Sequence, residues 1–279
     1  MFTLQVYNGN NSGPANNFDL TAKADPGANF AIRNGHLIFT EPYNIGYLLA
    51  QSAHMTDARL VSPTFSALNA DGFRIAGFSQ TAGLGGVPTL VDRFLSAPPM
   101  VPQYEEVQFQ GSTGTAEQQW GAMVLLTPGW NANVPSGPQM MMEATVTSFT
   151  PTVNVWSTPQ ALNFNSSPRG GVYAVIGASV QQTADTFAFQ IVFPRTKLYN
   201  GRKLNPGWIA QNAVGSFEDV ITQMNRFHLG VWGYFHTFEP PSVAVFPSTS
   251  AAMTPIVRLW TVYLGGDINL LNSALNTQN

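Results

Sequence analysis

Hydrophobic and polar residues alternate along most of the chain in short runs, the pattern of β-strands with a buried face. Between Pro168 and Pro194, an apolar run and a polar turn precede Phe187, Phe189, Ile191 and Phe193, which occupy every second position. Gly, Pro, Asn or Ser bounds most runs. The pattern predicts strands at 30–40, 46–54, 58–65, 72–79, 105–110, 120–127, 141–149, 152–157, 172–180, 186–193, 230–238, 242–246 and 256–264.

Helical patterns are sparse. Ser216 and Asp219 have the spacing of a capping box ahead of an amphipathic stretch that reaches residue 227. Two further short helices are predicted at 87–95, where Pro88 suits a first helical turn, and at 267–276. Many short strands with two or three helices indicate an all-β sandwich or barrel.

The order of these features repeats along the chain. The stretch 42–65 has the outline of 168–194, with Pro and Tyr matching at a constant offset. The other echoes are the Arg-Phe pairs at 93–94 and 226–227, the Trp-Gly pairs at 120–121 and 232–233, and closing strands at 141–148 and 256–264. The shared order favours an internal duplication. The alternative is one large sandwich whose strands resemble each other because all sandwich strands do.

The duplication predicts five parts. They are an N-terminal arm (1–29), a first sandwich (30–150), a linker (151–167), a second sandwich (168–266) and a C-terminal tail (267–279). The arm is rich in Asn, Gly and Ala and is expected to order only against a partner surface.

Composition narrows the class of protein. Only 10% of the 279 residues are charged, against about a quarter in an ordinary soluble domain. A net charge of −3 gives no general attraction to nucleic acid or acidic membranes. The absence of cysteine excludes disulfides and thiolate chemistry. The first residues lack the pattern of a signal peptide, so we expect synthesis in a cytosol.

No catalytic signature stands out, so we expect no enzyme activity, no cofactor and no metal site. The glycines of 83–94 precede an expected helix and could cradle a phosphate, although a plain turn is favoured. We interpret Glu105 and Glu106 as a solvated strand edge. The histidines are expected to be structural; they are His36, His54, His228 and His236.

The densest charge lies at 195–203, which holds four of the twelve cations: Arg195, Lys197, Arg202 and Lys203. This loop could face an anion or a neighbouring subunit. Alternatively it is a solvated hairpin turn built on Asn200-Gly201. The tail carries a short apolar stripe that should dock either on its own domain or on a neighbour: Ile268, Leu270, Leu271 and Leu275.

The paired hairpins and the Arg-Phe and Trp-Gly echoes give the chain a layout that resembles the double jelly-roll major capsid proteins of tailless icosahedral viruses, the lineage of adenovirus hexon and membrane-containing phages. The resemblance implies two tandem jelly-roll sandwiches and trimers that form pseudo-hexagonal capsomers in a virion, made in the host cytoplasm. It also implies partners: copies of itself, other capsid proteins such as a vertex protein, and internal membrane lipids or the packaged genome. It implies no small-molecule substrate.

Two other interpretations remain. One is a single jelly-roll capsid protein with insertions. The other is a carbohydrate-binding sandwich, such as a lectin or a phage receptor-binding protein, in which Trp130 and Trp208 would stack on sugars.

Overall fold

The computed structural model describes residues 1–26, 30–75, 89–181, 186–196, 198–209 and 229–277. The fold is all-β, as predicted, with two short helices among the described residues. The chain divides into two compact units. The N-terminal unit comprises Thr3–Asp25 and Asn29–Pro128, and the C-terminal unit comprises Gly129–Asn279 with Met1–Phe2 and Pro26–Ala28.

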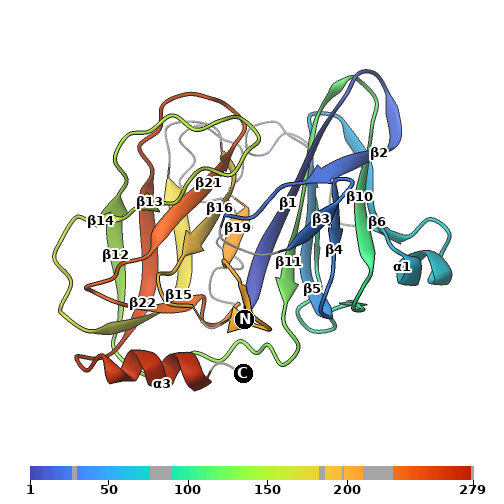
Figure 1. Ribbon diagram of the computed structural model, residues 1–279. Helices are drawn as coiled ribbons and strands as arrows, with labels where there is room; N and C mark the ends of the chain where they lie inside the picture. The colour runs from blue at the N-terminus through green and yellow to red at the C-terminus, as the bar shows by residue number, and fades with distance from the viewer. Residues whose placement is uncertain (27–29, 76–88, 182–185, 197, 210–228, 278–279) are drawn as a thin grey trace. The chain divides into compact units, whose positions relative to one another are not determined.

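The N-terminal unit contains eleven described strands and helix α1 (Pro63–Leu68), which can be followed by their labels in Figure 1. The strands are β1 (Phe2–Asn11), β2 (Ala15–Ala22), β3 (Ala31–Arg33), β4 (His36–Ile38), β5 (Tyr43–Gln51), β6 (Met55–Val61), β7 (Phe73–Arg74), β8 (Thr89–Arg93), β9 (Met100–Val101), β10 (Glu106–Thr113) and β11 (Glu117–Leu126). They pair in the orders β1-β11-β5-β8 and β2-β10-β6-β7, the β3–β4 hairpin joins through β10, and β9 pairs with β5. A short pairing between β1 and β2 connects the two groups of four strands into one sheet.

The C-terminal unit has the same design in its described strands. They are β12 (Gln139–Thr145), β13 (Gln160–Ala161), β14 (Asn163–Phe164), β15 (Val172–Gln181), β16 (Thr186–Val192), β17 (Leu198–Tyr199), β18 (Arg202–Lys203), β19 (Gly207–Ile209), β20 (Gly233–His236), β21 (Ser242–Pro247) and β22 (Ile256–Gly265). They pair in the orders β12-β22-β15-β20 and β13-β21-β16-β19, with β14 at the edge beside β12 and β17–β18 as a separate hairpin.

Both units have the jelly-roll connectivity. When the short extra strands are set aside, each unit uses eight strands in chain order. One group of four paired strands contains the first, eighth, third and sixth strands, and the other contains the second, seventh, fourth and fifth. Side chains from the two sheets meet in each core: the Phe109 ring of β10 packs on Gly121 of β11, and the Phe193 ring packs on Gly233 of β20. Two consecutive jelly rolls in one chain are therefore the architecture of this protein.

The two hairpins that suggested a duplication occupy equivalent places. Strands β5 and β6 are the third and fourth strands of the N-terminal jelly roll, and β15 and β16 are the third and fourth of the C-terminal one. In the second hairpin, nine of the ten residues of β15 and six of the seven residues of β16 are buried. The third strand lies inside its sheet with a neighbour on each side. This position explains why its sequence is a continuous apolar run.

The predicted domain boundary has to move. Residues 141–148 were expected to close the first sandwich, but β12 begins the second one by pairing with β22 along seven residues. The arm 1–29 was also wrong, since β1 and β2 are integral strands of the N-terminal unit. The change of unit falls between Pro128 and Gly129 rather than in 151–167. Strand pairing between distant segments, which local patterns do not encode, decides these assignments.

Four local predictions also fail. The single strand expected at 30–40 is a hairpin of two strands, β3 and β4, joined by a turn at Asn34-Gly35. Residues 89–93 of the expected helix at 87–95 form strand β8, which pairs with β5. The expected strand at 152–157 is a turn, with Asn154 in the left-handed region. The strand expected at 58–65 ends at Val61, and α1 follows because Ser62 accepts a hydrogen bond from the Phe65 N–H and Pro63 opens the helix. The helix expected at 216–227 and the glycines of 83–86 lie outside the described residues.

The Trp-Gly echo is not a structural repeat. Trp120-Gly121 lies in the eighth strand of its jelly roll, whereas Trp232-Gly233 lies at the start of the sixth. Arg93-Phe94 lies at the end of strand β8, and Arg226-Phe227 falls outside the described residues. The duplication is thus supported by strand order and by the paired hairpins, not by these dipeptides.

Candidate functional sites

The basic loop forms a tight hairpin. Strands β17 and β18 pair through Leu198 with Lys203 and Tyr199 with Arg202. Asn200 and Gly201 connect them with φ angles of 47° and 78°, the geometry of a type I′ turn. The Asn-Gly turn predicted from the sequence is therefore present. The turn explains the shape of the loop, whereas the role of its positive charges is a separate question.

Arg195 is bound within its own unit. Its guanidinium donates two hydrogen bonds to the Glu239 carboxylate, at 2.6 and 2.8 Å. The hydrogen bonds of this pair raise the pKa of Arg195 and lower that of Glu239. Both side chains are largely exposed, so the pair mainly sets the local shape and adds little stability. Lys197 lies outside the described residues.

The structure brings the basic loop and the tail together. A groove of about 360 Å³ is lined by Pro194, Leu198 and Leu275 as apolar members and by Arg195 and Lys203 among its polar members. Helix α3 (Asn269–Thr277) supplies Leu275, and the loop supplies Leu198 and Lys203. Sequence reasoning treated the two segments separately, because no local pattern links residues so far apart.

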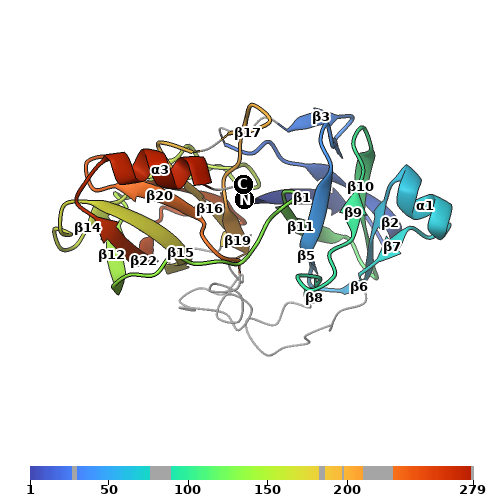
Figure 2. The same ribbon diagram turned by 90° about the horizontal axis from the view of Figure 1, so that it is seen from below.

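The tail docks on its own unit. Leu271 is 1% exposed and belongs to a cluster with Val172, Ala174, Tyr234 and Val262 on the sheet that contains β15, β20 and β22. Figure 2 shows α3 lying along β20. Leu275 packs at the margin of this cluster, whereas Ile268 and Leu270 remain exposed. Of the two expectations for the stripe, docking on its own domain applies to Leu271 and Leu275.

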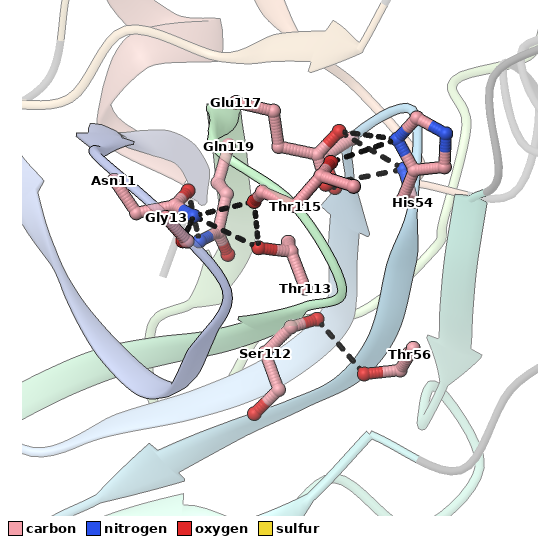
Figure 3. A network of polar contacts seen from close by, with 10 residues as sticks. Asn11, Gly13, His54, Thr56, Ser112, Thr113, Thr115, Glu117 and Gln119 are labelled. Carbon is pink, nitrogen blue, oxygen red and sulfur yellow. Dashed lines mark hydrogen bonds and ion pairs between the residues drawn. The ribbon is translucent and has the colours of Figure 1, made fainter.

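A network of polar side chains joins three turns at one end of the N-terminal unit (Figure 3). The buried Asn11 amide donates to the Thr115 carbonyl at 2.7 Å and to Thr113 Oγ1 at 3.1 Å, and it also bonds the Gly13 carbonyl. Gln119 Nε2 donates to Asn11 Oδ1 at 3.0 Å. These contacts tie the β1–β2 turn to the β10–β11 turn.

Glu117 connects this network to the β5–β6 turn. Its carboxylate accepts a hydrogen bond from Ser52 Oγ at 2.9 Å and two from the His54 N–H, at 3.0 and 3.1 Å. His54 Nδ1 lies 3.1 Å from the same carboxylate. The contact with Ser52 ties the β5–β6 turn to the start of β11. Sequence reasoning missed Glu117 and Gln119; the one signal was a glutamine directly before the apolar run at 120–126.

His36 is held between two carboxylates. Its Nε2 lies 2.6 Å from Asp19 Oδ2, and its Nδ1 forms a short contact with Glu106 Oε1. Partial burial lowers the pKa of His36, but the hydrogen bonds to Glu106 and Asp19 outweigh it, and the net pKa is raised. His36 and His54 each contact a carboxylate, as satisfied histidines should, and a purely structural role for them stays a prediction. Among the other two, the buried His236 accepts a hydrogen bond from the Phe238 N–H at 3.2 Å, and His228 lies outside the described residues.

The prediction for Glu105 and Glu106 is wrong. Glu105 accepts hydrogen bonds from the N–H and the hydroxyl of Thr64 at the start of α1, and Glu106 pairs with His36. The two side chains do point to different partners, as neighbours in a strand should. Both carboxylates connect the start of β10 to other segments of the unit instead of being free in solvent.

The tryptophans offer no exposed stacking platform. Trp208 is 2% exposed, and the Trp130 indole donates to the Leu229 carbonyl at 3.2 Å and is half-buried. Trp120, Trp156 and Trp232 are buried, and Trp260 is half-buried. These positions disfavour the interpretation in which tryptophans stack on sugars.

Across the described residues, no group of three or more His, Asp or Glu side chains is arranged to hold a metal ion. Within the same part of the chain, neither helix has the length and apolar character needed to cross a membrane.

Comparison with known proteins finds a likeness in structure but none in sequence. No protein-family model matches the chain, and no curated protein sequence matches it. Among solved structures, it is similar to the major capsid protein P2 from bacteriophage PM2, with 10% sequence identity and a TM-score of 0.23. That match covers 95% of this chain and 98% of the phage protein. The jelly-roll connectivity described above stands on the strand pairings of this chain alone.

Proposed function

We propose that the chain is a structural subunit that assembles with copies of itself into the shell of a virus. The observation that carries the proposal is the repeated strand order, with two complete jelly rolls in tandem in one polypeptide. Jelly rolls are the recurrent building blocks of viral capsids, and they also occur in lectins and cupins. The tandem arrangement favours the capsid, in agreement with the layout seen in the sequence.

The surface supports the same proposal. Charged residues make up 10% of the chain, so contacts between copies would remove few ions from water. Large apolar side chains are exposed on both units: Leu68 and Tyr104 on the N-terminal unit are 82% and 77% exposed, and Phe238 on the C-terminal unit is 83% exposed. Exposed aromatic residues of this kind are typical anchors of protein–protein interfaces.

The finer expectations belong to this proposal too. We propose that the subunit forms trimers, that the groups of three act as pseudo-hexagonal capsomers, and that it resides in the virion. The basic loop with Arg195, Lys197, Arg202 and Lys203 would face an anionic interior, such as lipid headgroups or genome, or a neighbouring subunit. A vertex protein would be a further partner. No enzymatic step and no cofactor are part of the proposal.

Light scattering coupled to size-exclusion chromatography tests the proposal. We expect a species of about three times the 30.2 kDa chain mass, or larger shell-like assemblies visible by negative-stain electron microscopy. A chain that remains monomeric at high concentration would contradict the proposal. A monomer that in addition binds a glycan array would support the carbohydrate-binding alternative, which the buried positions of the tryptophans disfavour.

A matched pair of variants sharpens this test. Phe238→Ser removes an exposed aromatic ring at the β20–β21 turn and should reduce the assembled fraction without lowering the melting temperature. Thr237→Ser, at the neighbouring position, keeps the hydroxyl that binds the Gly171 N–H and should assemble normally. If the two variants assembled equally well, Phe238 would not contribute to the interface.

A further inference from the structure

The β3–β4 hairpin is attached along the edge of a sheet in the N-terminal unit. Strand β4 pairs with the first two residues of β10, and β3 forms the outer edge. The turn at the end of the hairpin is Asn34-Gly35, with φ angles of 51° and 82°. His36 follows this turn directly, so its side chain lies at the tip of the hairpin.

The base and the tip of this hairpin are held differently. Leu37 and Phe39 at the base are 0% exposed, so apolar burial anchors them at any pH. The tip is held by one backbone hydrogen bond, from the Ala22 N–H to the Gly35 carbonyl at 2.6 Å, and by the imidazole of His36. That imidazole reaches Asp19 on β2 and Glu106 on β10, residues 17 and 70 positions away in the chain.

We propose that the tip of the β3–β4 hairpin is a pH-operated latch, fastened to β2 and β10 while both ring nitrogens of His36 carry a proton and loosened when one proton leaves. A carboxylate can only accept hydrogen bonds, and both ring nitrogens face one. Only the imidazolium can donate to both at once. The neutral ring donates to one carboxylate and presents a lone pair to the other, which breaks one contact and adds a repulsion.

The surrounding charges reinforce this behaviour. The acidic groups that face His36 are Asp19 from β2 and Glu106 from β10. Arg33, which is exposed, is the cationic cross-strand neighbour of His36 in the hairpin register. Glu105, beside Glu106, points instead to Thr64. With two carboxylates against one cation, the net field favours the protonated ring, in line with the raised pKa of His36.

The sign of the effect follows from linkage. Because the pKa of His36 in the folded protein lies above its ordinary value, the latch is fully fastened below about pH 6.5. It loosens as the pH rises through the folded pKa. The tip should therefore be held tightly in mildly acidic solution and become mobile on the alkaline side, while the base of the hairpin stays in place.

NMR spectroscopy of the full chain tests the latch in two ways. The ring signals of His36 should titrate with a pKa above 6.5. The protection of the Ala22 amide, which reports the bond to Gly35, should fall roughly tenfold between about pH 5.5 and about pH 8.5 after correction for the intrinsic exchange rate. The buried Leu37 amide should keep its protection. A constant protection of Ala22 across this range would overturn the proposal.

Variants separate the latch from a merely structural contact. Asp19→Asn and Glu106→Gln should each lower the pKa of His36 and shift the loosening of the tip to lower pH. His36→Gln should abolish the pH dependence of Ala22 protection. The control is His54→Gln, which removes the other histidine that contacts a carboxylate in this unit, here Glu117. It should leave the Ala22 profile unchanged. An unaltered profile in Asp19→Asn and Glu106→Gln would contradict the latch even if all variants fold.

Discussion

At the scale of single residues, two glycines let aromatic rings approach the backbone of a facing sheet. A Cβ added to Gly121 would lie 2.6 Å from the Phe109 ring, and one added to Gly233 would lie 2.5 Å from the Phe193 ring. Both rings are buried, with at most 1% exposed. This shared packing gives the Trp-Gly dipeptides a physical meaning, although their strands are not equivalent.

Gly121→Ala should therefore destabilise the N-terminal unit. We expect a loss of about 1–3 kcal/mol in the free energy of unfolding, because the added methyl group must displace a packed ring. Urea denaturation followed by tryptophan fluorescence measures it. Gly114→Ala is the matched control, since nothing lies within 4 Å of its added Cβ. If the two variants proved equally stable, the close approach of Phe109 would not be a constraint.

At the scale of elements, the C-terminal helix covers one face of a sheet. The outward face of β15, β20 and β22 carries Val172, Ala174, Tyr234 and Val262, which would be costly to leave in water. Helix α3 covers them through Leu271, with Leu275 at the margin. The Ile268 and Leu270 side chains remain exposed and are available for contacts with other molecules.

Leu271→Ala tests this role of the helix. The substitution removes the most buried side chain of α3 and should cost about 2–5 kcal/mol in the stability of the C-terminal unit. Ile268→Ala, at an exposed position of the same tail, should cost less than about 1 kcal/mol. Thermal unfolding monitored by circular dichroism compares the two. A small effect of Leu271→Ala would mean that α3 is not needed to cover the sheet.

At the scale of the whole molecule, a third of the positively charged residues lie in one short segment of the chain. Four of the twelve cations lie within nine residues, at 195–203, in a chain with few charges overall. The Asn-Gly turn defines the shape of their hairpin, and Arg195 binds Glu239 within the same unit. Because the positive charge is concentrated in this one segment, we expect these cations to contact an anionic partner or a neighbouring subunit.

Charge reversal at Arg195, Lys197, Arg202 and Lys203 to Glu should impair assembly while leaving folding intact. The measurements are particle yield by electron microscopy and the melting temperature. A variant that exchanges Lys197 and Lys203 for Arg and Arg202 for Lys conserves the charge and keeps the two hydrogen bonds of Arg195 to Glu239, so it should assemble as the parent does. Normal particle yield from the reversed variant would show that the loop has no partner in the assembly.

Predictions from sequence succeeded where the pattern was local and strong. Alternating aromatic and aliphatic residues identified both β5–β6 and β15–β16, and Asn200-Gly201 identified its turn. They failed where the pattern was short. Residues 89–93 fit a helix as well as a strand by periodicity, and pairing with β5 decides the matter. Strand β2 shows an alternation broken by exposed Asn and Asp residues, and it forms because β10 pairs with it.

The sequence by itself determined that this protein is an all-β chain with two copies of one hairpin design, few charges and a sharply turned basic loop. These properties follow from side-chain alternation and turn chemistry, which act over a few residues. Tertiary structure alone decided that the change of unit falls at Pro128–Gly129, and that His36 lies between Asp19 and Glu106. Strand partners are selected by long-range hydrogen bonding and burial, and no pattern within a single strand specifies its neighbour.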